Sequence, residues 1–359
     1  MLMARPIQAL IDLSALEHNL SVVRRHAPRS RVMAVIKADA YGHGVLRAAE
    51  ALGRADGFAL LEMDAAVRLR EAGYRQTILL LEGFFAMEEL ASIEQYHLST
   101  VIHHPAQLAM LSAYRQRGRL DVFLKLNTGM NRLGFTLEQF PGALETLKSN
   151  PAVGQITLMS HFARADESDR HESVAAQMQR FNAAAGGRNL PCSLANSAAI
   201  LRYPETHADW VRPGIMLYGA SPFSDRSAAE LDLYPAMTVS SKIIAVQELK
   251  SGDGVGYGHV FRADRSMRVG IVAGGYADGY PRHAPTGTAV LVDGKRTRVI
   301  GRVSMDMLHV DLSEILDAGV GSQVTLWGKG LPVDEVAQSA GTVGYELLCA
   351  LAPRMRIVT

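Results

Sequence analysis

A lysine at the end of an apolar segment is the first residue whose chemistry the sequence suggests. Lys37 closes the run RVMAVIK, and the string AVIKADAYGHG continues into a turn that contains Tyr41, Gly42 and Gly44. A lysine in that position is partly removed from water, which favours the neutral amine that reacts with an aldehyde. A solvated strand end is the alternative, and Lys37 alone does not decide between the two.

A second group of residues could bind an anion. In VRPGIMLYG, Arg212 precedes Gly214 and Ile215 at a predicted strand-to-helix turn, where exposed backbone N–H groups favour a phosphate. Ser197, which follows Asn196 in LANSAA, is another candidate phosphate ligand at the end of the preceding strand. A plain structural turn is the alternative for this segment.

Tyr257 is a third candidate, in the glycine-rich segment SGDGVGYGHVF. Glycines permit a tight loop in which the backbone approaches a ligand closely. Taken alone, the segment predicts a β-turn with an exposed tyrosine more simply than a site.

A regular set of strands has to position these residues. Short β-branched runs alternate with helical stretches over the first two-thirds of the chain, which predicts parallel strands joined by crossover helices. The predicted strands are 31–37, 57–62, 77–82, 98–103, 121–127, 156–161, 191–196 and 209–212. Eight strands close a (β/α)8 barrel, whose active site lies at their carboxyl ends. Polar residues end nearly every run, and we interpret Glu62, Glu82, His103 and His104 as ordinary strand ends.

The pattern changes after the barrel. A polar, proline-containing connector over residues 220–235 predicts a boundary, so we expect an α/β barrel domain over residues 1–228 and a mostly β domain over residues 229–359. In the second domain, Asp293-Gly294 predicts a hairpin turn. One helix is expected there, from about Asp334 to Ala350.

The start of the chain predicts a helix that precedes the first barrel strand. Ser14 and Glu17 in SALEHNL match a capping box, so this helix is expected to begin near residue 15.

Composition limits the class of protein. The chain has 359 residues, a net charge of +1, 48% hydrophobic and 20% charged residues, as in ordinary globular proteins. Basic residues are scattered among acidic ones, which leaves no basic surface for nucleic acid or an anionic membrane. Cys192 and Cys349 lack any metal or disulfide spacing, so no metal site is expected. The N-terminal apolar run is too short for a signal sequence or a membrane span, and a cytoplasmic location is expected.

Six strings together resemble one family. AVIKADAYGHG, KLNTGMNRLGF, VRPGIMLYG, GVGYG, GGYADGYPR and GRVSMDM occur in the order and at the spacing typical of alanine racemases. The resemblance runs from about residue 7 to the C-terminus. It implies a pyridoxal 5'-phosphate (PLP) enzyme, built as a (β/α)8 barrel followed by a mostly β domain, that interconverts L-alanine and D-alanine as a head-to-tail homodimer.

The resemblance also implies a role for each matched residue. Lys37 corresponds to the lysine that holds the cofactor and acts as one base, and Tyr257 corresponds to the second base, supplied by the other subunit with His161 supporting it. Arg212 matches the residue that faces the pyridine nitrogen. The matched phosphate positions are Tyr41, Ser197, Gly214, Ile215 and Tyr345.

The remaining matched positions concern the substrate. Arg132 matches a ligand of the substrate carboxylate, and Lys125 matches a lysine that is often carbamylated beside it. Met305 and Asp306 match residues that reach the site from the other subunit. The further positions are Asn196, in a supporting role, and Tyr276 and Tyr345, at the substrate entrance. Ser304 is a departure, because many relatives carry cysteine there.

Racemisation explains why two bases are needed, since a proton leaves one face of a planar carbon and another returns to the opposite face. A phenol with a pKa near ~10 needs nearby positive charge or hydrogen bonding to act as a base at neutral pH. The arginine matters as well, because a guanidinium donates a hydrogen bond to the pyridine nitrogen without protonating it, and this disfavours transamination.

Two other functions fit parts of the pattern. A PLP-dependent decarboxylase of the same architecture is the nearest enzymatic alternative, although such enzymes place an acidic residue at the pyridine nitrogen, where this chain offers Arg212. A non-catalytic PLP carrier needs only the barrel, and the long β domain with its Tyr257 loop argues against that alternative.

Overall fold

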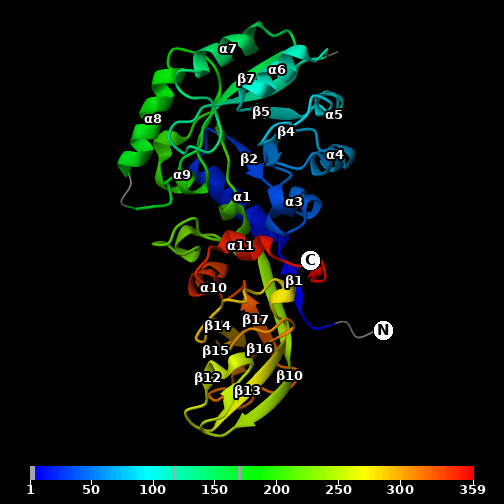
Figure 1. Ribbon diagram of the computed structural model, residues 1–359, viewed down its shortest axis with the longest axis vertical. Coiled ribbons are helices and arrows are strands. Elements are labelled where there is room, and N and C mark those ends of the chain that lie inside the picture. Colours follow the sequence, from blue (N-terminus) through cyan, green and yellow to red (C-terminus); the bar gives the residue numbers. More distant parts are fainter. Residues whose placement is uncertain (1–4, 116–117, 169–170) are drawn as a thin grey trace.

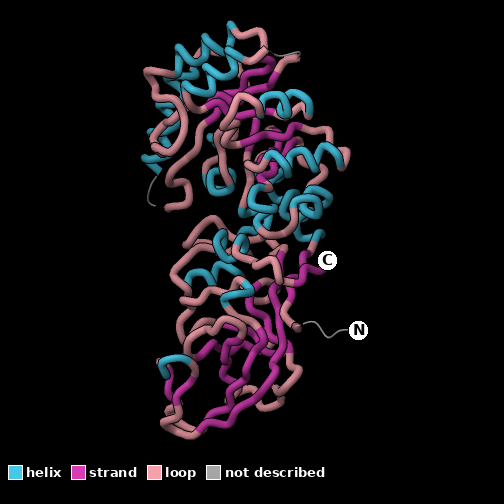
Figure 2. The backbone as a smooth tube through the Cα atoms, turned by 45° about the vertical axis from the view of Figure 1, so that its right-hand side comes forward, coloured by secondary structure: helices cyan, strands magenta, loops and turns pink. Residues whose placement is uncertain are grey.

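The structure, a computed structural model, describes residues 5–115, 118–168 and 171–359. It divides into a barrel in the upper half of Figure 1 and a β-rich part in the lower half, with the helix α11 at their junction. Figure 2 shows the strands of the lower part extending away from the barrel. The predicted fold class is confirmed.

Eight parallel strands form the closed barrel, each paired with its sequence neighbours and the last with the first. They are β2 (Arg31–Val35), β3 (Gly57–Leu60), β4 (Thr77–Leu80), β5 (Ser99–Ile102), β6 (Leu120–Lys125), β7 (Val153–Met159), β8 (Cys192–Ser193) and β9 (Trp210–Val211). Every predicted run overlaps one of these strands. Strands such as β3 and β5 are buried along their whole length, as expected where helices cover a parallel sheet that encloses a packed interior.

Helices surround the barrel. They are α1 (Leu13–His26), α3 (Val45–Ala51), α4 (Met63–Glu71), α5 (Glu89–Gln95), α6 (Pro105–Ala113), α7 (Phe140–Ser149), α8 (His171–Ala185) and α9 (Ser197–Arg202). The short segment α2 (Lys37–Tyr41) is a left-handed turn at the end of β2. The predicted helix before the first barrel strand is present and begins two residues earlier than expected, but its predicted capping residue is wrong. Asp12 caps the helix by accepting a hydrogen bond from the Ala15 N–H (3.1 Å), and Ser14 donates its hydroxyl to the same carboxylate (2.6 Å). An aspartate two residues earlier therefore takes the capping position.

The second sheet has eight strands in the order β13-β16-β15-β14-β17-β10-β1-β18. They are β1 (Gln8–Ile11), β10 (Met237–Leu249), β13 (Met267–Ala273), β14 (Ala289–Val292), β15 (Lys295–Ile300), β16 (Met307–Asp311), β17 (Gln323–Trp327) and β18 (Arg356–Val358). The strands β11 (Gly254–Val255) and β12 (Phe261–Arg262) form a separate hairpin. Asp293 and Gly294 both have positive φ (47° and 78°) between β14 and β15, which confirms the predicted hairpin turn.

The N-terminal strand belongs to this second sheet. β1 pairs antiparallel with β10, with Gln8 opposite Ser240, and parallel with β18, with Gln8 opposite Arg356. The chain thus starts in the β sheet, builds the barrel and returns. The division into two domains after residue 228 stays a prediction. Residues 8–11, although they precede the barrel in the sequence, lie in the sheet of the second part.

The single helix predicted over 334–350 is wrong. The structure has two helices there, α10 (Val333–Ser339) and α11 (Gly344–Cys349). Gly341 takes a left-handed φ of 71°, and the Thr342 N–H donates back to the Ala337 carbonyl (2.9 Å). This arrangement ends a helix at a glycine, and it frees α11 to turn toward the barrel. No helix among the described residues is both long and apolar enough to cross a membrane.

Candidate active site

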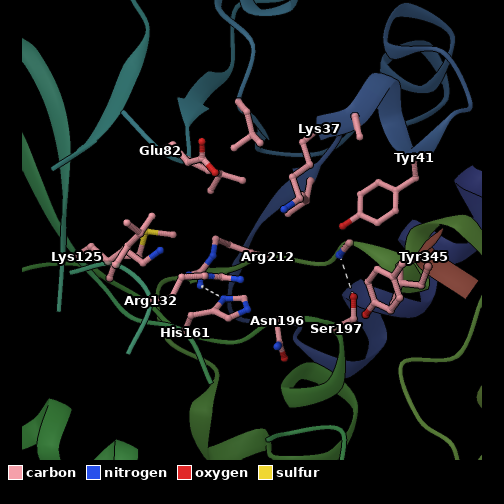
Figure 3. A pocket seen from close by; sticks show the side chains of 18 of the residues that line it. Lys37, Tyr41, Glu82, Lys125, Arg132, His161, Asn196, Ser197, Arg212 and Tyr345 are labelled. Carbon is pink, nitrogen blue, oxygen red and sulfur yellow. Dashed lines mark hydrogen bonds between the residues drawn. The ribbon is translucent and has the colours of Figure 1, made fainter. Parts of the chain in front are cut away.

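A cavity of about 750 Å³ opens at the carboxyl ends of the barrel strands, where the fold is expected to carry its chemistry. Figure 3 shows its polar side chains converging from different strands and from α11. Eleven of the predicted site residues line it: Lys37, Tyr41, Lys125, Arg132, His161, Asn196, Ser197, Arg212, Gly214, Ile215 and Tyr345. The volume lies within the range of sites for cofactors and small molecules.

Lys37 is followed by a strained turn. Ala38, Asp39, Ala40 and Tyr41 all have left-handed φ values between 51° and 55°, a conformation that costs roughly 1–2 kcal/mol per residue for an L-amino acid. Such a turn persists only where its surroundings hold it. It reverses the chain after β2 and directs both Lys37 and the Tyr41 ring into the cavity.

His43 helps to hold this turn. Its imidazole is fully buried, and burial lowers its pKa to about 4, so the ring is neutral at physiological pH. Nδ1 lies 3.0 Å from the carbonyl oxygen of Ala40 and 2.9 Å from that of Tyr41. A neutral ring can satisfy both carbonyl groups only as an Nδ1–H donor. The histidine therefore closes the turn from inside.

Hydroxyl and backbone N–H groups form a cradle next to the Tyr41 ring. The Ser197 hydroxyl oxygen accepts hydrogen bonds from the N–H groups of Gly214 (2.9 Å) and Met216 (3.4 Å). A Cβ atom at position 214 would lie 2.6 Å from the Tyr41 hydroxyl oxygen, so only glycine permits this approach. Tyr345, from α11, packs its ring 6.0 Å from that of Tyr41. Convergent hydroxyl and amide groups of this kind suit a phosphate.

Arg212 occupies the floor of the cavity. Its guanidinium donates to the Ser193 hydroxyl (2.6 Å) and to the Ser160 carbonyl (2.7 Å), and its Nη2 lies 3.3 Å from Nδ1 of His161. Burial lowers the pKa of Arg212 to about 10, so it remains charged at neutral pH. Burial, reinforced by this positive charge, lowers the pKa of His161 well below its usual value. The pair is therefore a cation beside a neutral imidazole.

The cavity is cationic. Lys37, Lys125, Arg132 and Arg212 line it, and the only carboxylate that the described residues add to the lining is that of Glu82. Lys125 and Arg132 form no ion pair with a carboxylate within the described part of the chain. Burial, and then the charges of the two arginines, lower the pKa of Lys125 to about 8. An excess of positive charge at the end of a barrel favours anionic ligands such as a phosphate and a carboxylate.

A buried hydrogen-bond network that the sequence did not reveal joins His161 to Thr128, four residues before Arg132. The side-chain amide of Gln177, from α8, donates to the Thr128 hydroxyl (3.0 Å) and to the His161 carbonyl (3.0 Å), and its oxygen accepts from the Ala163 N–H (2.9 Å). The Thr128 and Ser160 hydroxyls lie 2.8 Å apart. Gln177 sits in a helix without any motif, and no sequence pattern marks it.

Two residues interpreted as ordinary strand ends also line the cavity. Glu82 and His103 follow β4 and β5, and His103 Nε2 lies 3.0 Å from the Glu82 carbonyl oxygen. Their place after neighbouring barrel strands is the signal that could have identified them, because the carboxyl ends of barrel strands carry the site.

Four predicted site residues lie outside this cavity. They are Tyr257, Tyr276, Met305 and Asp306, all in short segments of the β-rich part. Tyr257 lies between β11 and β12, and Figure 1 shows β12 in its lower half, away from the barrel. The Tyr257 side chain is 72% exposed and that of Met305 is 52% exposed. One copy of the chain therefore does not bring these residues to Lys37.

Comparisons with known proteins agree on one family. The model of the alanine racemase N-terminal domain matches residues 11–222, and that of the C-terminal domain matches residues 236–359. The alanine racemase of Nitrosospira multiformis is 77% identical over 99% of this chain and 100% of its own, and that of Nitrosomonas europaea is 61% identical over 99% of both. The crystal structure of the biosynthetic alanine racemase from Pseudomonas aeruginosa superposes with a TM-score of 0.96, at 47% identity, over 98% of this chain and 99% of that one.

Proposed function

Because this chain belongs to the alanine racemase family, we propose that it interconverts L-alanine and D-alanine with PLP, using Lys37 of one subunit and Tyr257 of another as its two bases. The observation that carries the proposal is the cationic cavity in which Lys37 faces Arg212 and the cradle around Ser197. The two alternatives left by the sequence, a decarboxylase and a carrier, explain less of this arrangement.

The cavity fits PLP. Lys37 would hold the cofactor covalently, the hydroxyls of Tyr41, Ser197 and Tyr345 with the backbone of Gly214 and Ile215 would hold its phosphate, and Arg212 would face its pyridine nitrogen. The close approach of the Tyr41 hydroxyl to Gly214 supports this assignment. When bound, PLP supplies an electron sink that makes the α-proton of an attached amino acid labile.

Arg212 limits that electron sink. A guanidinium keeps its proton in proteins and can only donate a hydrogen bond, so the pyridine nitrogen stays unprotonated. A decarboxylase of this architecture needs an acidic residue there, and Glu82 is the only carboxylate among the described residues that line the cavity. The arginine therefore favours racemisation over decarboxylation and transamination.

The Arg212–His161 pair prepares the second base. Arg212 can only donate, so Nδ1 of His161 is the acceptor and the proton of the neutral ring lies on Nε2. That N–H would donate to the oxygen of a tyrosine entering the cavity and stabilise its anion. Tyr257 would then accept a proton on the face opposite to the Lys37 amine.

The second subunit follows from where Tyr257 lies. Its side chain is exposed on the β-rich part, while the cavity rim presents the equally exposed Phe85. Each has another exposed apolar residue close by in the sequence, Val260 near Tyr257 and Met87 near Phe85, and contiguous exposed apolar surface marks interaction sites. A head-to-tail homodimer would bring Tyr257, Met305 and Asp306 of one subunit to the barrel mouth of the other and complete two sites.

Lys125 and Arg132 would prepare the substrate subsite. With its pKa lowered to about 8, Lys125 is neutral often enough to react with carbon dioxide, releasing a proton and forming a carbamate. The new anion would hold the Arg132 guanidinium toward the substrate carboxylate. Incubation with ¹³C-bicarbonate should give a carbamate NMR signal that a Lys125→Met variant lacks.

Two experiments test the proposal. Purified protein with PLP should convert L-alanine to D-alanine, measured by chiral chromatography, and borohydride reduction followed by peptide mapping should place the cofactor on Lys37. Release of carbon dioxide from alanine as the main reaction would overturn it. The shared site is tested by mixing Lys37→Ala chains with Tyr257→Phe chains. Each is inactive alone, and the hybrid should regain one intact site.

A further inference from the structure

We propose that Asp278, in the motif GGYADGYPR, positions the loops that complete the active site of the partner subunit. This inference rests on the proposed function, because it requires a site shared between subunits. Asp278 lies in the β-rich part of the chain, touches none of the cavity in its own barrel, and would act through Met305 and Tyr276.

Asp278 is a buried carboxylate, 1% exposed, that binds groups from three parts of the chain. Its Oδ2 accepts a hydrogen bond from the Gly275 N–H (3.0 Å). Its Oδ1 lies 3.1 Å from Nη1 of Arg5 and 2.7 Å from Nε of Arg354. An aspartate is rarely buried unless it is paired, and here the N-terminal segment and the segment before β18 both supply a guanidinium.

The same two arginines hold the neighbouring loop. Nη2 of Arg354 donates to the Asp306 carboxylate (2.6 Å), and Nη2 of Arg5 donates to the Asp306 carbonyl (2.8 Å). Each arginine therefore bridges Asp278 and Asp306. Two carboxylates and two guanidinium groups form a neutral cluster, and removing one carboxylate leaves a net positive charge.

Backbone contacts join the two loops beside this cluster. The Tyr276 N–H donates to the Ser304 carbonyl (3.1 Å), and the Ala277 N–H donates to the Met305 carbonyl (3.0 Å). A Cβ atom at Gly275 would lie 2.2 Å from the Ser304 carbonyl oxygen. The loops therefore meet with no room for a side chain, and Asp278 fixes one end of that contact.

The cluster leaves the neighbouring side chains free for a partner. Met305 is 52% exposed and Tyr276 is 37% exposed, and both are among the residues expected at the substrate site of the other subunit. A loop held by two ion pairs and two backbone hydrogen bonds presents such side chains in one arrangement, which is what a substrate subsite requires.

The first test is the Asp278→Asn variant, which keeps the shape of the side chain but removes its charge. The KM for alanine should rise about tenfold with kcat changed much less, because the loops contact the substrate and leave Lys37 in place. The absorbance of bound PLP should remain that of the unmodified enzyme. Asp311→Asn is the matched control, since Asp311 is a buried aspartate of the same domain that pairs with Arg298 (3.1 Å) outside these loops.

Hybrid dimers then show whether Asp278 affects the KM of the active site in its own subunit or in the partner subunit. In a Lys37→Ala/Asp278→Asn chain paired with a Tyr257→Phe chain, the one active site uses the altered loops, and its KM should be raised. In a Lys37→Ala chain paired with a Tyr257→Phe/Asp278→Asn chain, the active site uses intact loops, and its KM should be that of the parent hybrid.

The outcomes separate this inference from the function on which it rests. A parent hybrid without activity removes the shared site and Asp278 with it. If the parent hybrid is active, the shared site stands. The role of Asp278 is then overturned if the KM rises in both pairings, in neither pairing, or only in the second. If Asp278→Asn chains do not assemble, Arg354→Gln in the same pairings decides, because this partly exposed arginine contacts both carboxylates.

Discussion

Nη2 of Arg212 lies 3.3 Å from Nδ1 of His161 at the floor of the barrel cavity. Because the guanidinium can only donate, this contact fixes the tautomer of the imidazole and leaves the Nε2–H free for another oxygen. Burial lowers the pKa of His161 and keeps the ring neutral, and the permanent charge of Arg212 adds to this effect, since a second cation at that distance is unfavourable.

Replacing His161 should therefore affect the base opposite Lys37. In His161→Leu, the tyrosine anion loses a donor, so kcat/KM should fall by about tenfold at neutral pH. The fall should shrink as the pH rises, because the phenol then loses its proton without help. pH profiles measured in both directions check this. His104→Leu, outside the cavity, is the control, and an equal loss at every pH would contradict the assignment.

Replacing Arg212 should change which reaction occurs. An Arg212→Glu carboxylate would let the pyridine nitrogen take a proton, and side transamination should then rise relative to racemisation. Formation of the aminated cofactor and of pyruvate during long incubation with alanine measures the ratio. Arg212→Lys keeps a positive charge and should show a smaller increase. If the ratio of transamination to racemisation is unchanged in Arg212→Glu, Arg212 does not act by limiting electron withdrawal into the cofactor.

Gln177 offers a test of the network behind Arg132. In Gln177→Glu the new carboxylate oxygen cannot donate to the Thr128 hydroxyl or the His161 carbonyl. Because both buried acceptors lose their donor and face a carboxylate instead, the free energy of unfolding should fall by about 1–3 kcal/mol. The KM for alanine should rise, because the segment from Thr128 to Arg132 loses the hydrogen bond to Gln177. Urea unfolding and steady-state kinetics measure the two effects. A stability loss with an unchanged KM would mean that the network is structural only.

Asp334 should make stability depend on pH. Burial raises its pKa from 3.8 to about 6, so the folded state holds the proton more tightly than the unfolded state. The resulting stabilisation is complete below about pH 4 and is lost as the pH rises through about 6.

Asp334→Asn removes that dependence and can still accept the hydrogen bond from the Ser221 N–H. The free energy of unfolding of the variant should match that of the parent near pH 4 and exceed it by about 3 kcal/mol at pH 7.5. Denaturant unfolding at several pH values measures the difference. Asp317→Asn, at a 95% exposed side chain, should show no such trend, and an asparagine variant less stable than the parent at pH 7.5 would be the contrary result.

The barrel could be predicted from the sequence because its strands are short, apolar and regularly spaced, and each overlaps its predicted run. Residues at the ends of those strands were also predictable, since topology brings the carboxyl ends of parallel strands to one edge. Lys37, Arg212 and Ser197 are examples. Local patterns failed where two signals competed, as at Asp12 and Ser14, or where one glycine interrupts a helical pattern, as at Gly341.

Other features depend on contacts between distant segments, which no local pattern contains. Gln177 reaches Thr128 across 49 positions, and Asp278 meets Arg5 across 273. The left-handed turn after Lys37 is a further case, because residues 38–41 are four consecutive non-glycine residues, and no sequence pattern marks such a run for positive φ. Tertiary packing around His43 holds that turn.

The pairing of β1 with both β10 and β18 has a consequence for how the molecule can be made and cut. β1 is synthesised before the barrel, and its two neighbours are synthesised after it, so the β sheet closes only once more than two hundred intervening residues have been translated. A cut at residue 228 would leave β1 on the fragment that lacks both of its partner strands, β10 and β18. Joining the two ends beside β1 and β18 and opening an exposed barrel loop, by contrast, should yield a permuted chain with every strand still in its register.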